Sequence, residues 1–171
     1  MSEKTPTIEK SQEELMELST IASQYIAKNE DTKLRRALKV KIEPQLIKAQ
    51  KKYTIQREDI CRKYAATGEV NGRKDIVLKG EKGEYLYEKG AQKTADDEIN
   101  QLFSGESGIL YKIIPFYTDP PEDLEVHEII AFKGILIDPD HPMCSDEYLL
   151  NPPSKKEKSD TKENDSNELK K

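Results

Sequence analysis

The most constraining feature of this 171-residue chain is a helical pattern that runs through "TKLRRALKVKIEPQLIKAQKKYTIQREDICRKYAA" and contains one proline. Apolar residues recur there mostly in steps of three or four, the spacing that places them on one side of an α-helix. They are Leu34, Leu38, Ile42, Leu46, Ala49, Tyr53, Ile60 and Tyr64. Because Pro44 removes a backbone hydrogen bond and clashes with the preceding turn, we expect a kink or break between 40 and 44 and one long helix over 44–66.

A shorter helix is expected before this pattern. Ser11 and Glu14 form an S-x-x-E capping box, in which each side chain satisfies a free backbone N–H of the other residue. Apolar residues at helical spacing follow, so the sequence predicts a helix near 12–28. The first ten residues are polar, and we expect residues 1–10 to be flexible. Thr32 is placed to cap the helix that follows.

The second half of the chain changes to a mixed pattern. A β-hairpin is expected over 74–88, where "DIVLK" and "EYLYEK" flank "GEKG". A helix over 91–103, capped by the Thr of "AQKTADDE", should follow. The apolar run 108–116 favours a strand, a helix is expected over 121–132, and "ILID" at 135–138 suggests a further strand.

Composition indicates a small core, because 35% of the residues are hydrophobic and 36% are charged. We therefore expect an α+β fold in which long charged helices pack on a small antiparallel sheet built from 74–88, 108–116 and 135–138. A core this small favours burial of the long helix against another copy or another protein. The predicted organisation is a flexible N-terminus over 1–10, a single domain over 11–150 (helical over 11–66 and mixed over 67–140), and a disordered, highly charged tail over 151–171.

Charge bears on the kind of partner. The net charge of −5 argues against a generally basic nucleic-acid binder, since the phosphate backbone attracts positive faces. One local stretch is basic nevertheless, and it contains Lys33, Arg35, Arg36, Lys39 and Lys41. These cations either contact phosphates or an acidic partner, or form an ordinary solvated helix face, and the sequence leaves both interpretations open.

The cysteines and the apolar segments indicate the compartment. Cys61 and Cys144 are far apart and form no CxxC motif, which favours a reducing environment over a disulfide scaffold. No stretch approaches the roughly 18 apolar residues that a membrane span needs, and the first residues contain no apolar signal segment. A cytoplasmic location without membrane contact is expected.

No catalytic signature, phosphate-binding loop or cofactor motif occurs, so we predict no enzyme activity, cofactor or metal. Two segments deserve comparison with metal sites. In "TDPPEDLEVH", Asp119, Asp123 and His127 combine ligand types, but prolines and carboxylates also suit the first turn of a helix. His141 and Cys144 offer two zinc ligands where a structural site needs four.

The order of features resembles a group of small proteins of tailed phages and prophages, including those of gut Bacteroides-type bacteria. The resemblance covers about residues 32–138. It is carried by "KLRRALKVKIEPQLIKAQKKY", the "ICRKYA" junction with its "NG", the "GEYLYEK" strand and the ending "SGILYKIIPFYTDPPEDLEVHEIIAFKGILID". It implies a viral setting and supplies no catalytic residues. The first helix and the charged tail depart from the pattern of that group.

Three function hypotheses follow. The first is a non-enzymatic protein–protein interaction protein, a phage structural, assembly or accessory component that binds a protein partner or itself, in the host cytoplasm or incorporated in a virion. The alternative is a nucleic-acid-associated regulator that uses the basic helix 33–41. The third is a small metal-dependent hydrolase around Asp119, Asp123 and His127.

Overall fold

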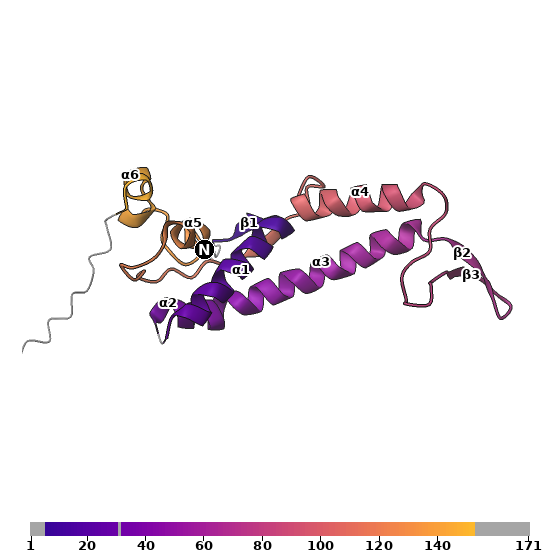
Figure 1. Ribbon diagram of the computed structural model, residues 1–171, viewed down its shortest axis with the longest axis horizontal. Coiled ribbons are helices and arrows are strands. Elements are labelled where there is room, and N and C mark those ends of the chain that lie inside the picture. Colours follow the sequence, from indigo (N-terminus) through magenta and orange to yellow (C-terminus); the bar gives the residue numbers. More distant parts are fainter. Residues whose placement is uncertain (1–5, 31, 153–171) are drawn as a thin grey trace, which may run out of the picture.

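The structure, a computed structural model, describes residues 6–30 and 32–152. Its elements in chain order are β1 (Ile8–Lys10), α1 (Gln12–Lys28), α2 (Lys33–Ala37), the π-helical turn η1 (Leu38–Ile42), α3 (Glu43–Tyr64), β2 (Thr67–Val70), β3 (Arg73–Val77), α4 (Ala91–Ser104), β4 (Tyr111–Ile113), α5 (Val126–Phe132), the 3₁₀ turn η2 (Pro142–Cys144) and α6 (Asp146–Leu150). Helices thus combine with two small antiparallel sheets, and the predicted α+β class is confirmed. Figure 1 shows α3 and α4 extending side by side, as an arm, from the larger end of the molecule to the β2–β3 hairpin.

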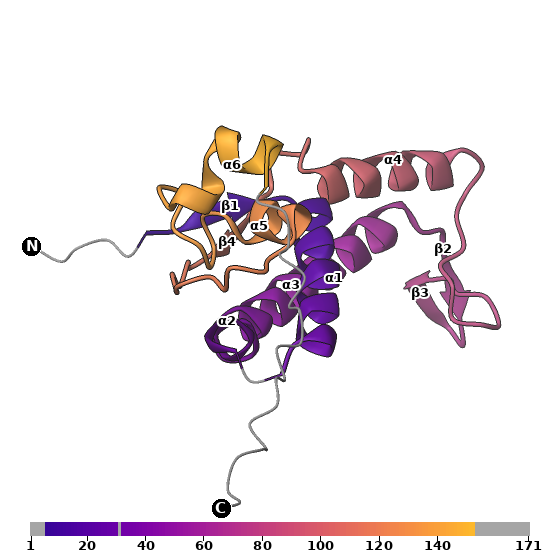
Figure 2. The same ribbon diagram turned by 60° about the vertical axis from the view of Figure 1, so that its left-hand side comes forward.

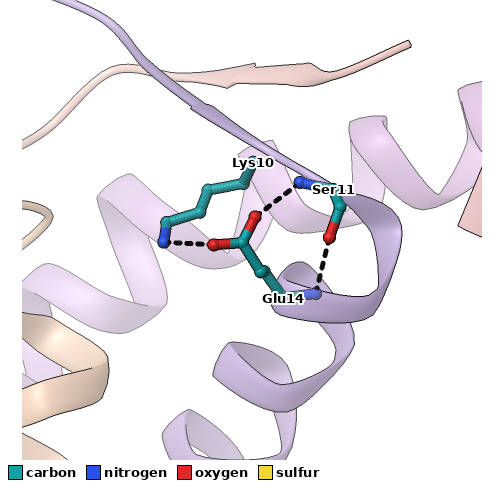
Figure 3. A network of polar contacts seen from close by, with 3 residues as sticks. All are labelled: Lys10, Ser11 and Glu14. Atoms are coloured by element: carbon teal, nitrogen blue, oxygen red, sulfur yellow. Dashed lines mark hydrogen bonds and ion pairs between the residues drawn. The ribbon is translucent and has the colours of Figure 1, made fainter. Parts of the chain in front are cut away.

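The first helix begins where the capping box predicts. The Glu14 N–H donates to Ser11 Oγ at 3.2 Å, and the Ser11 N–H donates to Glu14 Oε2 at 2.8 Å (Figure 3). Lys10 Nζ adds an ion pair with Glu14 Oε1 at 2.7 Å. Partial burial alone would raise the pKa of Glu14, but the hydrogen bonds from Lys10 and Ser11 outweigh it and lower that pKa below its usual value. The predicted bounds of this helix are confirmed.

The proline in the long helical pattern produces a local change of helix type. Thr32 Oγ1 caps α2 by accepting from the Arg35 N–H at 3.1 Å. The chain then widens into η1, where the Glu43 N–H reaches back five residues to the Leu38 carbonyl, and α3 starts with Pro44 in its first turn. Pro44 has no N–H to donate, and the wider π-helical turn before it accommodates the missing hydrogen bond without ending the helix. The irregularity expected between 40 and 44 is therefore present without a break, and α3 is the predicted long helix.

The core lies at the larger end of the molecule, between α1, α2, η1, α5 and the segment after α5. Tyr25 of α1 meets Phe132 of α5 edge to face, with ring centroids 5.7 Å apart. The largest fully buried aliphatic side chains of this cluster are Leu34, Leu38, Ile42, Ile113, Ile129, Ile135, Leu136 and Ile137. The arm has a thinner interior that continues from this core, where Tyr53 of α3, at the edge of the core cluster, contacts Phe103 of α4.

The prediction of one sheet built from 74–88, 108–116 and 135–138 is wrong, because the strands of the structure have other bounds and other partners. β4 is only the centre of the expected 108–116 strand, and it pairs with β1 in the register Ile8↔Ile113 (Figure 2). The expectation that residues 1–10 are flexible is therefore wrong for Ile8–Lys10, whereas residues 1–5 lie outside the described part. A strand of three residues in a polar stretch leaves no alternation in the sequence, so only its partner identifies it.

The hairpin and the "ILID" segment also differ from expectation. The turn that closes the longer hairpin is Asn71-Gly72, whose φ values of 53° and 77° suit the tight turn between β2 and β3. The expected hairpin around "GEKG" is present but short. It has the antiparallel bridge Lys79↔Tyr85, and the N–H groups of Leu86 and Gly80 donate to the carbonyls of Leu78 and Glu84 at 3.1 and 2.8 Å. Residues 135–137 are buried around a turn at Gly134, whose N–H donates to the Ile137 carbonyl. The carbonyls of Ile135 and Leu136 accept from the N–H groups of residues 116 and 118, outside any named strand.

Smaller differences concern the helix ends and the last described residues. The bounds expected for α4 hold within one residue, but its N-cap is Gly90, and the threonine expected as the cap lies inside the helix. Of the predicted tail over 151–171, everything from residue 153 lies outside the described residues. Within the part of the chain that the structure describes, no helix has the length and apolarity to cross a membrane.

Candidate interaction surface

The basic residues singled out from the sequence lie on α2 and η1, and one of the five, Arg35, is engaged within the fold. Lys33, Arg36, Lys39 and Lys41 are exposed, while the apolar stripe beside them is buried. Arg35 is half-buried, and its Nε donates to the carbonyl of Ile26 at 3.2 Å. The guanidinium of Arg35 therefore links α2 to the end of α1, which makes it a structural residue rather than a free cation.

The positive charge continues well beyond these five residues. Residues 33–64 contain eleven Lys and Arg side chains and three Asp and Glu side chains, a net charge of +8 within a chain of net −5. Counting charges over the whole predicted helical stretch, rather than over residues 33–41 alone, reveals this positive charge in the sequence. The candidate surface therefore extends onto α3.

The segment that contains β4 lies along this basic helix. Gln45 of α3 fixes it, because Gln45 Oε1 accepts from the Ile114 N–H at 2.8 Å and Gln45 Nε2 donates to the Ile114 carbonyl at 3.0 Å. Lys41 Nζ lies 5.3 Å from the ring centroid of Phe116, and Lys52 Nζ lies 5.7 Å from that of Tyr111. Residues 111–116 thus run alongside the helix in the opposite direction.

Lysines and one aromatic ring meet at this junction. Lys48 stands seven residues after Lys41 and four before Lys52, so the three lysines share one side of the helix. Phe116 retains 42% of its surface. We call the set Lys41, Lys48, Lys52 and Phe116 the basic–aromatic face. Lys112 is exposed but does not belong to it, because it alternates along the strand with Tyr111, which faces α3.

The charges of this face are mostly uncompensated. Among residues 6–30 and 32–152, Lys41, Lys48 and Lys52 form no ion pair, whereas Lys112 Nζ lies 3.6 Å from Glu9 Oε1. Farther along α3, Lys63 is paired with Glu98 of α4 at 2.9 Å. Charge at Lys41, Lys48 and Lys52 therefore remains available to a partner.

A second feature is an apolar groove of about 560 Å³ between α1 and the first half of α3. Leu15, Ala22 and Leu38 are buried along it, while Met16 and Ile47 stand at its edges with 48% and 50% of their surfaces exposed. At one end, Gln12 Nε2 donates to Gln50 Oε1. The Oε1 atom of Gln12 is buried and has no hydrogen-bond partner among the described residues. The sequence does not reveal this groove, because both helices show ordinary amphipathic patterns.

The acidic segment that resembled a metal site has a different structure from the one predicted. The helix begins at Val126, not near residue 121, so Asp123 precedes it and shares no helical face with His127. Glu125 is the N-cap, and its N–H donates to Glu128 Oε2 at 2.9 Å in a second capping box. Proline disfavours helical backbone at the residue before it, so the helix starts only after both prolines, at the position where this capping box forms. His127 Nδ1 lies 3.4 Å from Glu125 Oε2.

The remaining metal-ligand and thiol residues take part in local packing. His141 Nδ1 accepts from the Met143 N–H at 3.3 Å and so caps η2, and burial raises the pKa of the Cys144 thiol. Burial, together with the neighbouring Cys61 thiol, raises the pKa of Tyr87 to about 12. Within residues 6–30 and 32–152, no three His, Cys, Asp or Glu side chains gather in a metal-binding group.

Comparisons with protein-family models, with curated proteins and with solved structures gave no match.

Proposed function

We propose that this chain is a non-enzymatic interaction protein that binds a protein partner through the groove between α1 and α3. The observation that carries the proposal is the groove itself, which is apolar along its floor and has half-exposed Met16 and Ile47 at its edges. Apolar grooves between helices are a common docking mode for a partner helix or loop. An exposed apolar patch of this kind favours association.

The shape of the arm supports the same function. The main core cluster reaches only as far as Tyr53 on α3. Beyond it, the buried side chains described along the arm include Cys61, Ala95 and Leu102, while Ile55 remains largely exposed on α3. A pair of helices with so thin an interior gains stability when a partner covers it.

The biological setting belongs to the proposal as well. The sequence resemblance to tailed-phage proteins supports a structural, assembly or accessory role, in the host cytoplasm or within a virion. Capsid, portal or tail genes next to the gene for this chain are the expected finding. A neighbourhood of metabolic genes without phage genes would contradict the setting and leave the groove proposal intact.

Light scattering coupled to size-exclusion chromatography, at low and high salt, tests for self-association, and pull-down from host lysate tests for a separate partner. Ile47→Glu places a charge at the groove edge and is expected to abolish the complex. Leu150→Glu is the matched control, because Leu150 is 79% exposed on α6 and away from the groove. A strictly monomeric protein without any partner that depends on Ile47 would refute the proposal.

The basic–aromatic face favours a second candidate function, association with nucleic acid. Its support is the net charge of +8 over residues 33–64 and the uncompensated lysines at the start of α3. A gel shift at low salt tests it, and binding should weaken steeply as salt is added. Because Arg35 holds α2 in place, Lys48→Glu with Lys52→Glu is a cleaner test than substitution of Arg35.

A further inference from the structure

We propose that the basic–aromatic face binds single-stranded nucleic acid, with lysines on successive phosphates and Phe116 stacked on a base. This inference rests on the second candidate function and adds the class of nucleic acid and the role of each residue. It is independent of the apolar groove, whose residues lie on another side of α3.

The lysines are spaced for an extended polyanion. With about 1.5 Å of rise per helical residue, Lys41 and Lys52 stand roughly 16 Å apart along the axis, and Lys48 lies between them. At about 3.4 Å of rise per nucleotide, a stacked strand presents roughly five phosphates over that length. A line of separated charges suits a chain of phosphates better than a single anion.

The aromatic ring favours a single strand over a duplex. Phe116 lies beside Lys41 with 42% of its surface exposed, and its neighbours Ile114 and Tyr117 are also exposed at 48% and 45%. Base faces are covered by their neighbours inside a duplex, whereas a single strand offers them to aromatic side chains. An acidic polypeptide would match the lysines but offers a planar group only where it contains an aromatic residue, whereas every nucleotide of a single strand carries one. The combination of ring and cations therefore points to single-stranded nucleic acid.

Fluorescence anisotropy with the full-length chain tests the proposal. The probes are a labelled oligothymidylate of about 20 nucleotides, which exceeds typical site sizes for such surfaces, and a duplex of equal length. With three phosphate contacts, the affinity for the single strand should fall roughly 20-fold between about 50 and 200 mM salt. Tighter binding of the duplex would overturn the single-strand assignment while leaving nucleic-acid association in place. Absence of binding to either probe at low salt would remove both.

Charge reversal locates the site. Lys48→Glu with Lys52→Glu should weaken binding at least about tenfold and reduce the salt effect to about threefold, as expected for the one remaining contact of Lys41. The matched control is Lys89→Glu with Lys93→Glu, which makes the same change of charge at exposed positions around the start of α4. Equal losses from the two pairs would show that only net charge matters, and would overturn the assignment to this face.

Substitution of the ring separates stacking from charge. Phe116→Leu keeps an apolar side chain but should cost about fivefold or more in single-strand affinity, and Phe116→Tyr should restore it. The same affinity for all three proteins would refute the stacking role. A polyglutamate chain of similar length serves as competitor. If it displaces the oligothymidylate as well as unlabelled oligothymidylate does, the surface is selective only for negative charge, and the proposal fails.

Discussion

Replacing Gln45 by alanine should loosen the attachment of residues 111–116 to α3. The Gln45 carboxamide donates to the carbonyls of Lys41 and Ile114, and it accepts from the Ile114 N–H at 2.8 Å. Two of these three hydrogen bonds satisfy the backbone of Ile114, just after β4 ends. At about 0.5–1.5 kcal/mol each, loss of these two bonds should lower the free energy of unfolding by about 1–3 kcal/mol. Because the site is partly open to water, which can replace lost partners, we expect a value near the lower end.

Urea denaturation followed by circular dichroism measures this change, and a loss of about 1–2 kcal/mol should lower the melting temperature by roughly 2–8 °C for a domain of this size. Hydrogen exchange supplies a local measurement, in which the Ile114 amide should lose protection before the amides of α1 do. Gln24→Ala is the matched control, since Gln24 is an exposed glutamine on α1. Stability within about 0.5 kcal/mol of wild type and an unchanged Ile114 exchange rate would refute the reasoning, because surface substitutions ordinarily fall in that range.

Three further predictions concern the core, the hairpin and the first capping box. Leu34→Ala should lower the free energy of unfolding by about 2–5 kcal/mol in urea denaturation because Leu34 is fully buried, and a loss no larger than that of Leu150→Ala would contradict its place in the core. Gly72→Ala should destabilise the β2–β3 turn by about 1–2 kcal/mol because φ is +77° there, seen as weaker cross-strand NMR contacts, and a strengthened hairpin would count against this turn. Glu14→Gln should keep the capping box but lose the charge. Because folding lowers the pKa of Glu14, the ionised carboxylate stabilises the folded state. This stabilisation is fully present at pH values above the unfolded pKa of 4.5, and it is lost as the pH falls through the lower pKa of the folded state. Unfolding curves of wild type and Glu14→Gln should therefore differ slightly at pH 7 and coincide in acid, and a gap that widens in acid would contradict this sign.

The helices were predictable because their signals are local. Ser11 with Glu14 marks the start of α1, Thr32 caps α2, and Pro44 disturbs the chain within a few residues of its own position. Each of these effects depends on side chains one turn apart, so the sequence contains all the information needed. The start of α5 was misplaced because two competing local signals occur there, and the later capping box at Glu125 determines it.

The sheets were not predictable for the opposite reason. Ile8–Lys10 becomes a strand only because residues about a hundred positions later lie beside it, and its own sequence has one apolar residue. Residues 135–137 are as apolar as a buried strand, yet they form a buried turn, and periodicity cannot distinguish these states in so short a run. The candidate surface shows the same limit, since the basic stretch is visible in the sequence but its contact with Phe116 is not.

The two proposed surfaces share one helix, and the helical period explains how α3 can carry both. Leu46, Ile47 and Gln50 line the groove toward α1, whereas Gln45 and Lys52 contact the segment that contains β4. Steps of one and two residues turn the side chain by about 100° and 200°, so these neighbours point to different sides. A protein in the groove and a strand on the basic–aromatic face would therefore occupy different surfaces. Ile47→Glu should abolish binding in the groove without weakening the nucleic-acid complex by more than a small charge effect, and reversal of Lys48 and Lys52 should do the converse. If either change abolished both activities, the two surfaces would be one site, and the separation argued from the helix would be wrong.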